Sequence, residues 1–258
     1  MSLVFDLYVS GDSWLHNLDP RVKLWTALLG IVTTFLLDSL VPQAAFLIGV
    51  HVLLRCASVP WRSLRWVWRQ MAILLLFILI LQPFFTPSGA SLIALGPLRL
   101  TWGGVQSALL LALRTISMAL ITIGILFTTD QHALVRAFVG LGLPYTWGLT
   151  LSLTLRFLPT MQRLFSTVRE AQSARGWLPH GNFVRRARDY IPVVVAVVIG
   201  TMRLSDQLTL ALAARGLGDL HIRTVWRELS MQRRDWAVLT IVTLTFLALA
   251  VSRFSGVP

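Results

Sequence analysis

Several residue types that serve disulfide formation, metal binding or solvation are scarce in this sequence. The 258 residues include one cysteine, Cys56, which excludes an internal disulfide and any site built from several cysteines. Charged residues make up 13% of the chain, where soluble domains have roughly a quarter, and hydrophobic residues make up 55%. Lys23 is the one lysine among 23 basic residues, so arginine supplies almost all the positive charge. This composition favours a membrane protein over a soluble one.

The motifs of common enzyme classes are also missing. The sequence has no HExxH or GxSxG pattern and no glycine-rich phosphate loop, so we expect no enzyme activity and no ATP hydrolysis by this chain. None of the five histidines lies at ligand spacing from another histidine or from Cys56, so we expect no metal and no cofactor. The first twenty residues lack a basic start and an apolar core, which argues against a cleavable signal peptide.

Long apolar runs are what the sequence has instead. A bilayer core needs about 20 mostly apolar residues per helix. Two helices are predicted within 24–54, joined by a turn at Asp38-Ser39, and the first of them begins at Asp19 and Pro20, a cap and a first helical residue. Further spans are predicted at 71–85, 102–129 and 236–251, with a basic interfacial loop at 55–69 and a short outer loop at 87–101.

The stretch from residue 130 to residue 235 differs because it is helical in pattern but rich in arginine. Three helices are predicted there, at about 131–141, 145–175 and 184–215, with Pro159 and Pro192 bending or breaking the last two. Its one long apolar stretch, Ile191 to Met202, is interpreted as too short to span a membrane. We therefore predict an all-α polytopic membrane protein with about five transmembrane helices. Its expected parts are a membrane domain at 1–129, a cytoplasmic arm of long helices at 130–235 and a last transmembrane helix at 236–258.

The distribution of positive charge predicts the orientation. Twenty of the 23 basic residues fall before the first span, in 55–69 or in 130–235. Because basic residues stay on the cytoplasmic side, the N-terminus is expected there. Arg114 lies well inside a predicted span, where it either faces a polar seam or a partner, or reaches an interface. An ion-coupled transporter would place acids or broken helices at the midplane, and the one candidate, Asp38, lies at the end of a span.

Two identical tripeptides, 40 residues apart, each close a predicted long helix of the arm. They consist of Ala174, Arg175 and Gly176, and of Ala214, Arg215 and Gly216. Glycine just past a helix end accepts the left-handed conformation that ends the helix, and the arginine then lies at the negative pole of the helix dipole. An ordinary helix cap would explain one such tripeptide. Two copies in one arm favour a second interpretation, in which each helix presents one bidentate cation to a partner.

These motifs resemble those of the T components of energy-coupling factor (ECF) transporters, the EcfT/CbiQ family. The resemblance covers nearly the whole chain and begins at His16-Asn17-Leu18-Asp19-Pro20-Arg21-Val22-Lys23-Leu24. Arg156-Phe157-Leu158-Pro159 and the two Ala-Arg-Gly tripeptides follow in the order of the family.

The resemblance implies a non-catalytic coupling subunit in the cell membrane of a prokaryote. Two cytoplasmic ABC-type ATPase subunits would bind the arm, with Arg175 and Arg215 each in a groove of one ATPase. A separate substrate-binding membrane protein, the S component, would dock on the apolar arm, and the transported substrate would be a vitamin or a transition-metal ion. The alternative is the permease of a conventional ABC importer, because Glu170-Ala171 with Gly176 matches the start of the cytoplasmic motif of those proteins.

Overall fold

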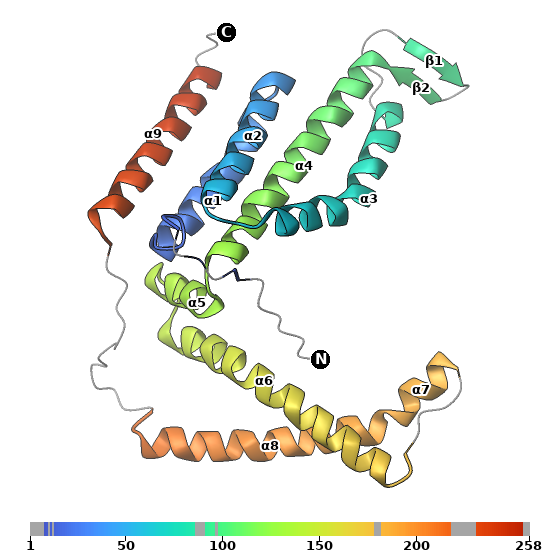
Figure 1. Cartoon of the computed structure of the whole chain (residues 1–258), viewed down its shortest axis with the longest axis vertical. Coiled ribbons are helices and arrows are strands. Elements are labelled where there is room, and N and C mark those ends of the chain that lie inside the picture. Colours follow the sequence, from blue (N-terminus) through green and yellow to red (C-terminus); the bar gives the residue numbers. More distant parts are fainter. Residues whose placement is uncertain are drawn as a thin grey trace. The chain divides into compact units, whose positions relative to one another are not determined.

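The computed structural model describes residues 8–9, 11, 13–85, 91–95, 98–177, 182–217 and 231–254. Within these ranges the chain is almost entirely helical, with one short antiparallel hairpin (Figure 1). The elements in chain order are α1 (Pro20–Leu36), α2 (Leu40–Cys56), α3 (Trp61–Phe85), β1 (Ser91–Leu95), β2 (Leu98–Thr101), α4 (Trp102–Thr128), α5 (Gln131–Gly140), α6 (Tyr145–Ala174), α7 (Phe183–Asp189), α8 (Ile191–Ala214) and α9 (Arg233–Phe254).

The chain divides into two compact units. The first comprises Met1–Leu143 and Leu229–Pro258, and the second comprises Pro144–Glu228. Helix α5 therefore belongs with the N-terminal helices and α9, whereas α6, α7 and α8 form the second unit. The three functional parts expected from the sequence divide the chain at residues 129 and 235, and those boundaries stay predictions.

Helix α4 is the centre of the first unit and contacts α1, α2 and α3. Its buried side chains, Ile116 and Leu120, join a core with Leu54 of α2 and Leu64 of α3. Helices α3 and α4 approach closely at Gly104 of α4, where an added Cβ would lie 2.6 Å from the carbonyl oxygen of Pro83 in α3. The apolar runs of the sequence thus form a bundle, as the membrane prediction requires.

The beginning of α1 is fastened to α4 and α9 by buried polar groups. Asp19 caps α1 and its backbone N–H donates to the carboxylate of Asp235, 3.0 Å away, although the two residues lie far apart in sequence. The ammonium group of Lys23 donates to the carbonyl oxygens of His16 and Thr128, at 3.0 and 2.9 Å. The single lysine of the chain is therefore a buried structural residue.

The turn between α1 and α2 falls at Leu37–Ser39, as Asp38-Ser39 predicted. Arg114 of α4 reaches this turn: its guanidinium donates to the carbonyl oxygens of Thr34 and Leu37, at 3.0 and 2.9 Å, and pairs with Asp38 at 2.7 Å. Arg253 of α9 also pairs with Asp38. Of the alternatives for Arg114, the contacts match a polar seam between helices, in which its charge lies against the carbonyl end of α1.

Two predicted loops contain regular structure. Residues 61–69 are the first part of α3, which makes a marked angle with the rest of that helix (Figure 1). This part is amphipathic, because Leu64 and Val67 are fully buried while the arginines between them and around them are exposed. The predicted outer loop at 87–101 contains the β1–β2 hairpin, in which Leu95 pairs with Leu98.

By length and composition, four stretches of the described helices could cross a membrane: α3, α4, residues Ala187–Ala214, and α9. Helix α2 is a shorter apolar helix, and α1 has the same length of 17 residues. The chain is thus an α-helical polytopic membrane protein. The interpretation of 191–202 as too short is wrong on length, because α8 continues to Ala214 with few charges beyond Met202.

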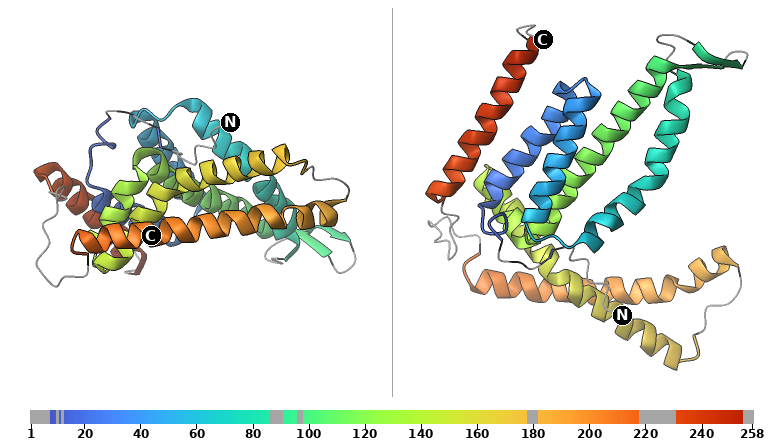
Figure 2. Two further views of the ribbon diagram at one scale, coloured as in Figure 1. Left: turned by 90° about the horizontal axis from the view of Figure 1, so that it is seen from below. Right: turned by 45° about the horizontal axis from the view of Figure 1, so that its top comes forward.

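In the second unit α6 and α8 cross and run in opposite directions (Figures 1 and 2). Leu164 of α6 packs against Gly200 of α8, where an added Cβ would lie 3.2 Å from its methyl carbon. Helix α6 is continuous through Pro159, whereas the helix predicted at 184–215 is divided at Tyr190, just before Pro192 in the first turn of α8. Pro192 favours a helix start at this point, because its fixed φ and missing N–H suit a first helical turn, whereas α6 accommodates Pro159 in its interior.

Candidate functional site

Both tripeptides end long helices, with the same backbone geometry. Helix α6 ends at Ala174 and α8 at Ala214, and the following glycines have positive φ values of 85° and 74°. The amide of Gly176 donates to Ser173 and that of Trp177 to Gln172, and the corresponding bonds of α8 run from Gly216 to Ala213 and from Leu217 to Leu212, at 2.9–3.0 Å. This is the Schellman motif in both places. The predicted helix ends are therefore confirmed.

The side chains of the two tripeptides face solvent in the described structure. Ala174, Arg175, Gly176, Ala214, Arg215 and Gly216 are all exposed. The ion pairs among the described residues are those of Arg114 and Arg253 with Asp38. Within these residues, neither Arg175 nor Arg215 forms an ion pair. Each arginine is the C-cap residue of its helix, where the last carbonyl groups carry a partial negative charge that favours a cation. Each helix end can thus offer a whole bidentate donor to a carboxylate or backbone partner.

The two arginines lie at opposite ends of the α6–α8 pair. The helices cross at Leu164 and Gly200, so the first tripeptide begins ten residues beyond the crossing and the second fourteen residues beyond it. At a rise of about 1.5 Å per residue, these arms are roughly 15 and 21 Å long. Because the helices are antiparallel, the tips are on the order of 30 Å apart. This separation suits two binding grooves better than one.

Trp177, which sequence reasoning did not single out, braces the first tip. Its indole N–H donates to the carbonyl oxygen of Asp189 at 2.7 Å, and its ring stands edge-on to Tyr190, with centroids 5.0 Å apart. Tyr190 is the residue before α8. The end of α6 is therefore tied to the beginning of α8. An aromatic residue directly after the helix-ending glycine was the available signal.

A groove of about 370 Å³ lies between α6 and α8 and is largely apolar. Phe157 and Leu158, from the Arg-Phe-Leu-Pro segment noted in the sequence, line it together with Met161 of α6 and Leu204 of α8. Along α8, a further row of apolar side chains is about half exposed or more, comprising Ile191, Val194, Val195, Val198, Ile199, Met202 and Leu210. The second unit thus combines cationic helix ends with apolar helix flanks.

The N-terminal segment that resembles the family, residues 16–24, connects α1 to its neighbours in the part of the chain that the structure describes. The Nε2–H of its histidine, His16, donates to the Val9 carbonyl oxygen 2.9 Å away, and the Ser13 hydroxyl lies 2.6 Å from Nδ1. Arg21 lies against Gly140 at the end of α5, where its guanidinium fills the space that a Cβ would need. Together with Asp19 and Lys23, these residues join α1 to its neighbours.

These features define a polytopic α-helical membrane protein with paired cationic helix ends. A family model described as CbiQ, cobalt transport protein, matches residues 11–224. The chain is 29% identical to the energy-coupling factor transporter transmembrane protein EcfT of Streptococcus equi subsp. equi (strain 4047), over 94% of this chain and 93% of that relative. EcfT of Streptococcus thermophilus and of Heliobacterium modesticaldum are also 29% identical, over 96% and 95% of each chain. The chain belongs to the CbiQ/EcfT family of ECF transporter transmembrane components.

Proposed function

We propose that this chain is the coupling subunit of an ATP-driven ECF-type importer, and that Arg175 and Arg215 dock two cytoplasmic ABC-type ATPase subunits. The observation that carries the proposal is the pair of identical, exposed, identically capped helix ends on antiparallel helices. Membership of the CbiQ/EcfT family supports the transporter context. ATP is bound and hydrolysed by the partner subunits, and this chain has no catalytic role.

The second unit would transmit the movement of the ATPases. Closure of the two ATPases would move the two tips, and α6 and α8 would carry that motion to their crossing at Leu164 and Gly200. The apolar groove at Phe157 and Leu204, with the exposed apolar side chains of α8, would receive the substrate-binding S component in the membrane. A largely apolar face suits a membrane partner, because few polar groups would have to give up hydrogen bonds to water when the partner binds.

The substrate would be set by the S component and would be a vitamin or a transition-metal ion. The chain would lie in the cell membrane of a prokaryote with its N-terminus cytoplasmic, because most arginines fall on the predicted inner side. On this orientation the arginine-rich second unit meets the cytoplasm, where the ATPases are.

Co-purification with the ATPase pair tests the docking. We expect Arg175→Glu and Arg215→Glu each to weaken binding at least about thirtyfold, since removing one member of a hydrogen-bonded charge pair at an interface costs about 2–5 kcal/mol. The double variant should lose the ATPases in detergent. Arg163→Glu and Arg203→Glu are matched controls, because they reverse exposed arginines on the same two helices away from their ends.

The controls decide the outcome. If Arg163→Glu with Arg203→Glu releases the ATPases as completely as the reversals at the tips, general surface charge holds them and the docking role is refuted. If the tip reversals leave binding unchanged, the docking role of Arg175 and Arg215 is refuted as well.

A further inference from the structure

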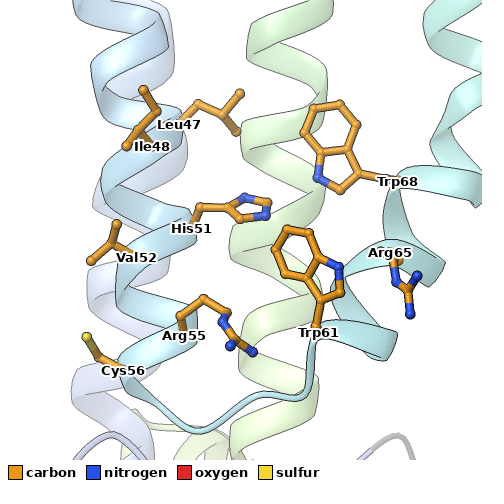
Figure 3. A pocket seen from close by; sticks show the side chains of 9 residues that line it. All are labelled: Leu47, Ile48, His51, Val52, Arg55, Cys56, Trp61, Arg65 and Trp68. Carbon is orange, nitrogen blue, oxygen red and sulfur yellow. The ribbon is translucent and has the colours of Figure 1, made fainter.

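A second groove lies in the first unit, between α2 and the first part of α3, and none of its lining residues takes part in the coupling proposal (Figure 3). Its volume is about 790 Å³, within the usual range of small-molecule sites. The lining residues are Leu47, Ile48, His51, Val52, Arg55 and Cys56 of α2, and Trp61, Arg65 and Trp68 of α3.

The groove has an apolar end and a cationic end. Leu47 and Ile48 lie toward one end, while Arg55 and Arg65 lie toward the other, on either side of Trp61 (Figure 3). The guanidinium carbon of Arg55 is 5.8 Å from the centre of the Trp61 ring, and one of its N–H groups donates to the Val59 carbonyl oxygen at 3.2 Å. His51 stands between Trp61 and Trp68, with ring centroids 6.1 and 6.2 Å away.

The positive charge of this end has no acidic counterpart nearby in the sequence. Between Asp38 and Asp130 the chain contains no aspartate or glutamate, although this stretch includes Arg55 and Arg65. Both arginines are exposed and neither has an ion pair within the described ranges. An anion from outside the chain is therefore the natural partner of this pair.

We propose that this groove binds an anionic phospholipid, with the phosphate at the cationic end, where Arg55 and Arg65 flank Trp61, and an acyl chain along Leu47, Ile48 and Val52. Arginine pairs bidentately with phosphate oxygens, and tryptophan is enriched at the headgroup level of membranes. The apolar end runs along α2, which is a short apolar helix, so an acyl chain there would meet aliphatic side chains. A choline headgroup is disfavoured, because the two guanidinium groups repel its ammonium.

The single cysteine reports on the groove without any engineering. Cys56 is exposed and lines it. In the purified chain in dodecyl maltoside, we would measure the rate at which N-ethylmaleimide alkylates Cys56 while titrating dioleoylphosphatidylglycerol. Dioleoylphosphatidylcholine tests the headgroup charge, and glycerol 3-phosphate tests whether the phosphate suffices without acyl chains. We expect protection by the phosphatidylglycerol at lower mole fractions than the phosphatidylcholine, and none by glycerol 3-phosphate.

Two double variants localise the binding. Arg55→Gln with Arg65→Gln should raise the phosphatidylglycerol mole fraction needed for half-protection about thirtyfold, since each arginine near anionic lipid contributes roughly fivefold in affinity. Arg62→Gln with Arg69→Gln removes the same amount of charge from exposed positions of α3 outside the groove, and should shift the half-protection mole fraction by no more than about threefold. Half-protection is compared within each variant, so a changed thiol reactivity does not enter.

Native mass spectrometry of the same samples gives an independent reading, with one retained phosphatidylglycerol expected in the wild type and none in the groove variant. Equal protection by phosphatidylcholine would overturn the proposal, as would equal shifts in both double variants, which would mean diffuse surface attraction. If glycerol 3-phosphate protects Cys56 without any lipid, the groove is a site for soluble phosphate compounds and the proposal is likewise overturned. No ATPase is present, so these outcomes are separate from those of the docking experiment.

Discussion

The two helix-ending glycines are the most direct place to test how the candidate site is built. Gly176 and Gly216 have φ values of 85° and 74°, in the left-handed region, and a Cβ added at either would meet no atom within 4 Å. The whole effect of Gly176→Ala or Gly216→Ala is therefore one of backbone conformation. An alanine in this region costs about 1–2 kcal/mol relative to glycine. Each substitution should open its cap roughly five- to thirtyfold more often.

Hydrogen–deuterium exchange measures this opening at the residues that close each cap. The amides of Trp177 and Leu217 donate to the carbonyl oxygens of Gln172 and Leu212, at 3.0 and 2.9 Å. We expect their exchange to accelerate by the same five- to thirtyfold in the corresponding variant. The two caps should respond separately, since they end different helices.

Gly49→Ala is the matched control, because Gly49 lies inside α2 and an added Cβ there also meets no atom within 4 Å. An alanine in a helix interior is favoured over glycine by about 0.5–1 kcal/mol, so this variant should be stabilised. If Gly176→Ala and Gly216→Ala leave the exchange of Trp177 and Leu217 unchanged, the argument from left-handed backbone is refuted. If Gly49→Ala destabilises as much as they do, the effect is not one of φ.

Three further substitutions test the first unit by unfolding in mixed micelles of dodecyl maltoside and sodium dodecyl sulfate. Arg114→Leu should lower the free energy of unfolding by about 2 kcal/mol, since the carbonyl end of α1 and Asp38 lose charge-assisted hydrogen bonds, and ATPase co-purification should be unaffected. Asp235→Asn should lower it by about 2 kcal/mol, because its carboxylate accepts two backbone N–H groups. Gly104→Ala should lower it by about 1–3 kcal/mol through its clash with Pro83, while Gly49→Ala should not.

The local signals in the sequence predicted most helix ends. Asp19 with Pro20, Asp38 with Ser39, and the glycines at 176 and 216 each determine a helix end through bonds to residues a few positions away. Such features depend on short-range chemistry, which a sequence shows directly. For the same reason the break before α8 was foreseen at Pro192, although its position at Tyr190 was not.

The amphipathic pattern of residues 61–69 explains why they were predicted as a loop. Residues 61–69 carry arginines and tryptophans that favour an interfacial position, and this charge was interpreted as a loop. The spacing of Leu64 and Val67, three residues apart and both buried, is that of a helix lying with one side against the core. This helical spacing of apolar residues is visible in the sequence, but the many arginines around it led to the prediction of a loop.

Contacts between distant segments could not be predicted. Arg114 lies 76 residues from Asp38, and Asp235 lies 216 residues from Asp19, so neither pairing has a local signature. Their formation depends on the order in which helices pack, and on the rotation of each helix about its axis. A charge within an apolar helix was correctly marked as unusual, but its partner became apparent only in three dimensions.

The two tripeptides separate what the fold requires from what it does not. The left-handed backbone at 176 and 216 accounts for the glycines. It does not account for Arg175 and Arg215, because the residue before each glycine has ordinary φ values of −86° and −93° that any amino acid adopts. Nor does packing account for them, since both side chains are exposed. The repeated arginine is thus dispensable for the helix ends, so a substitution there that abolishes coupling while leaving Trp177 and Leu217 protected would assign it to a partner outside this chain.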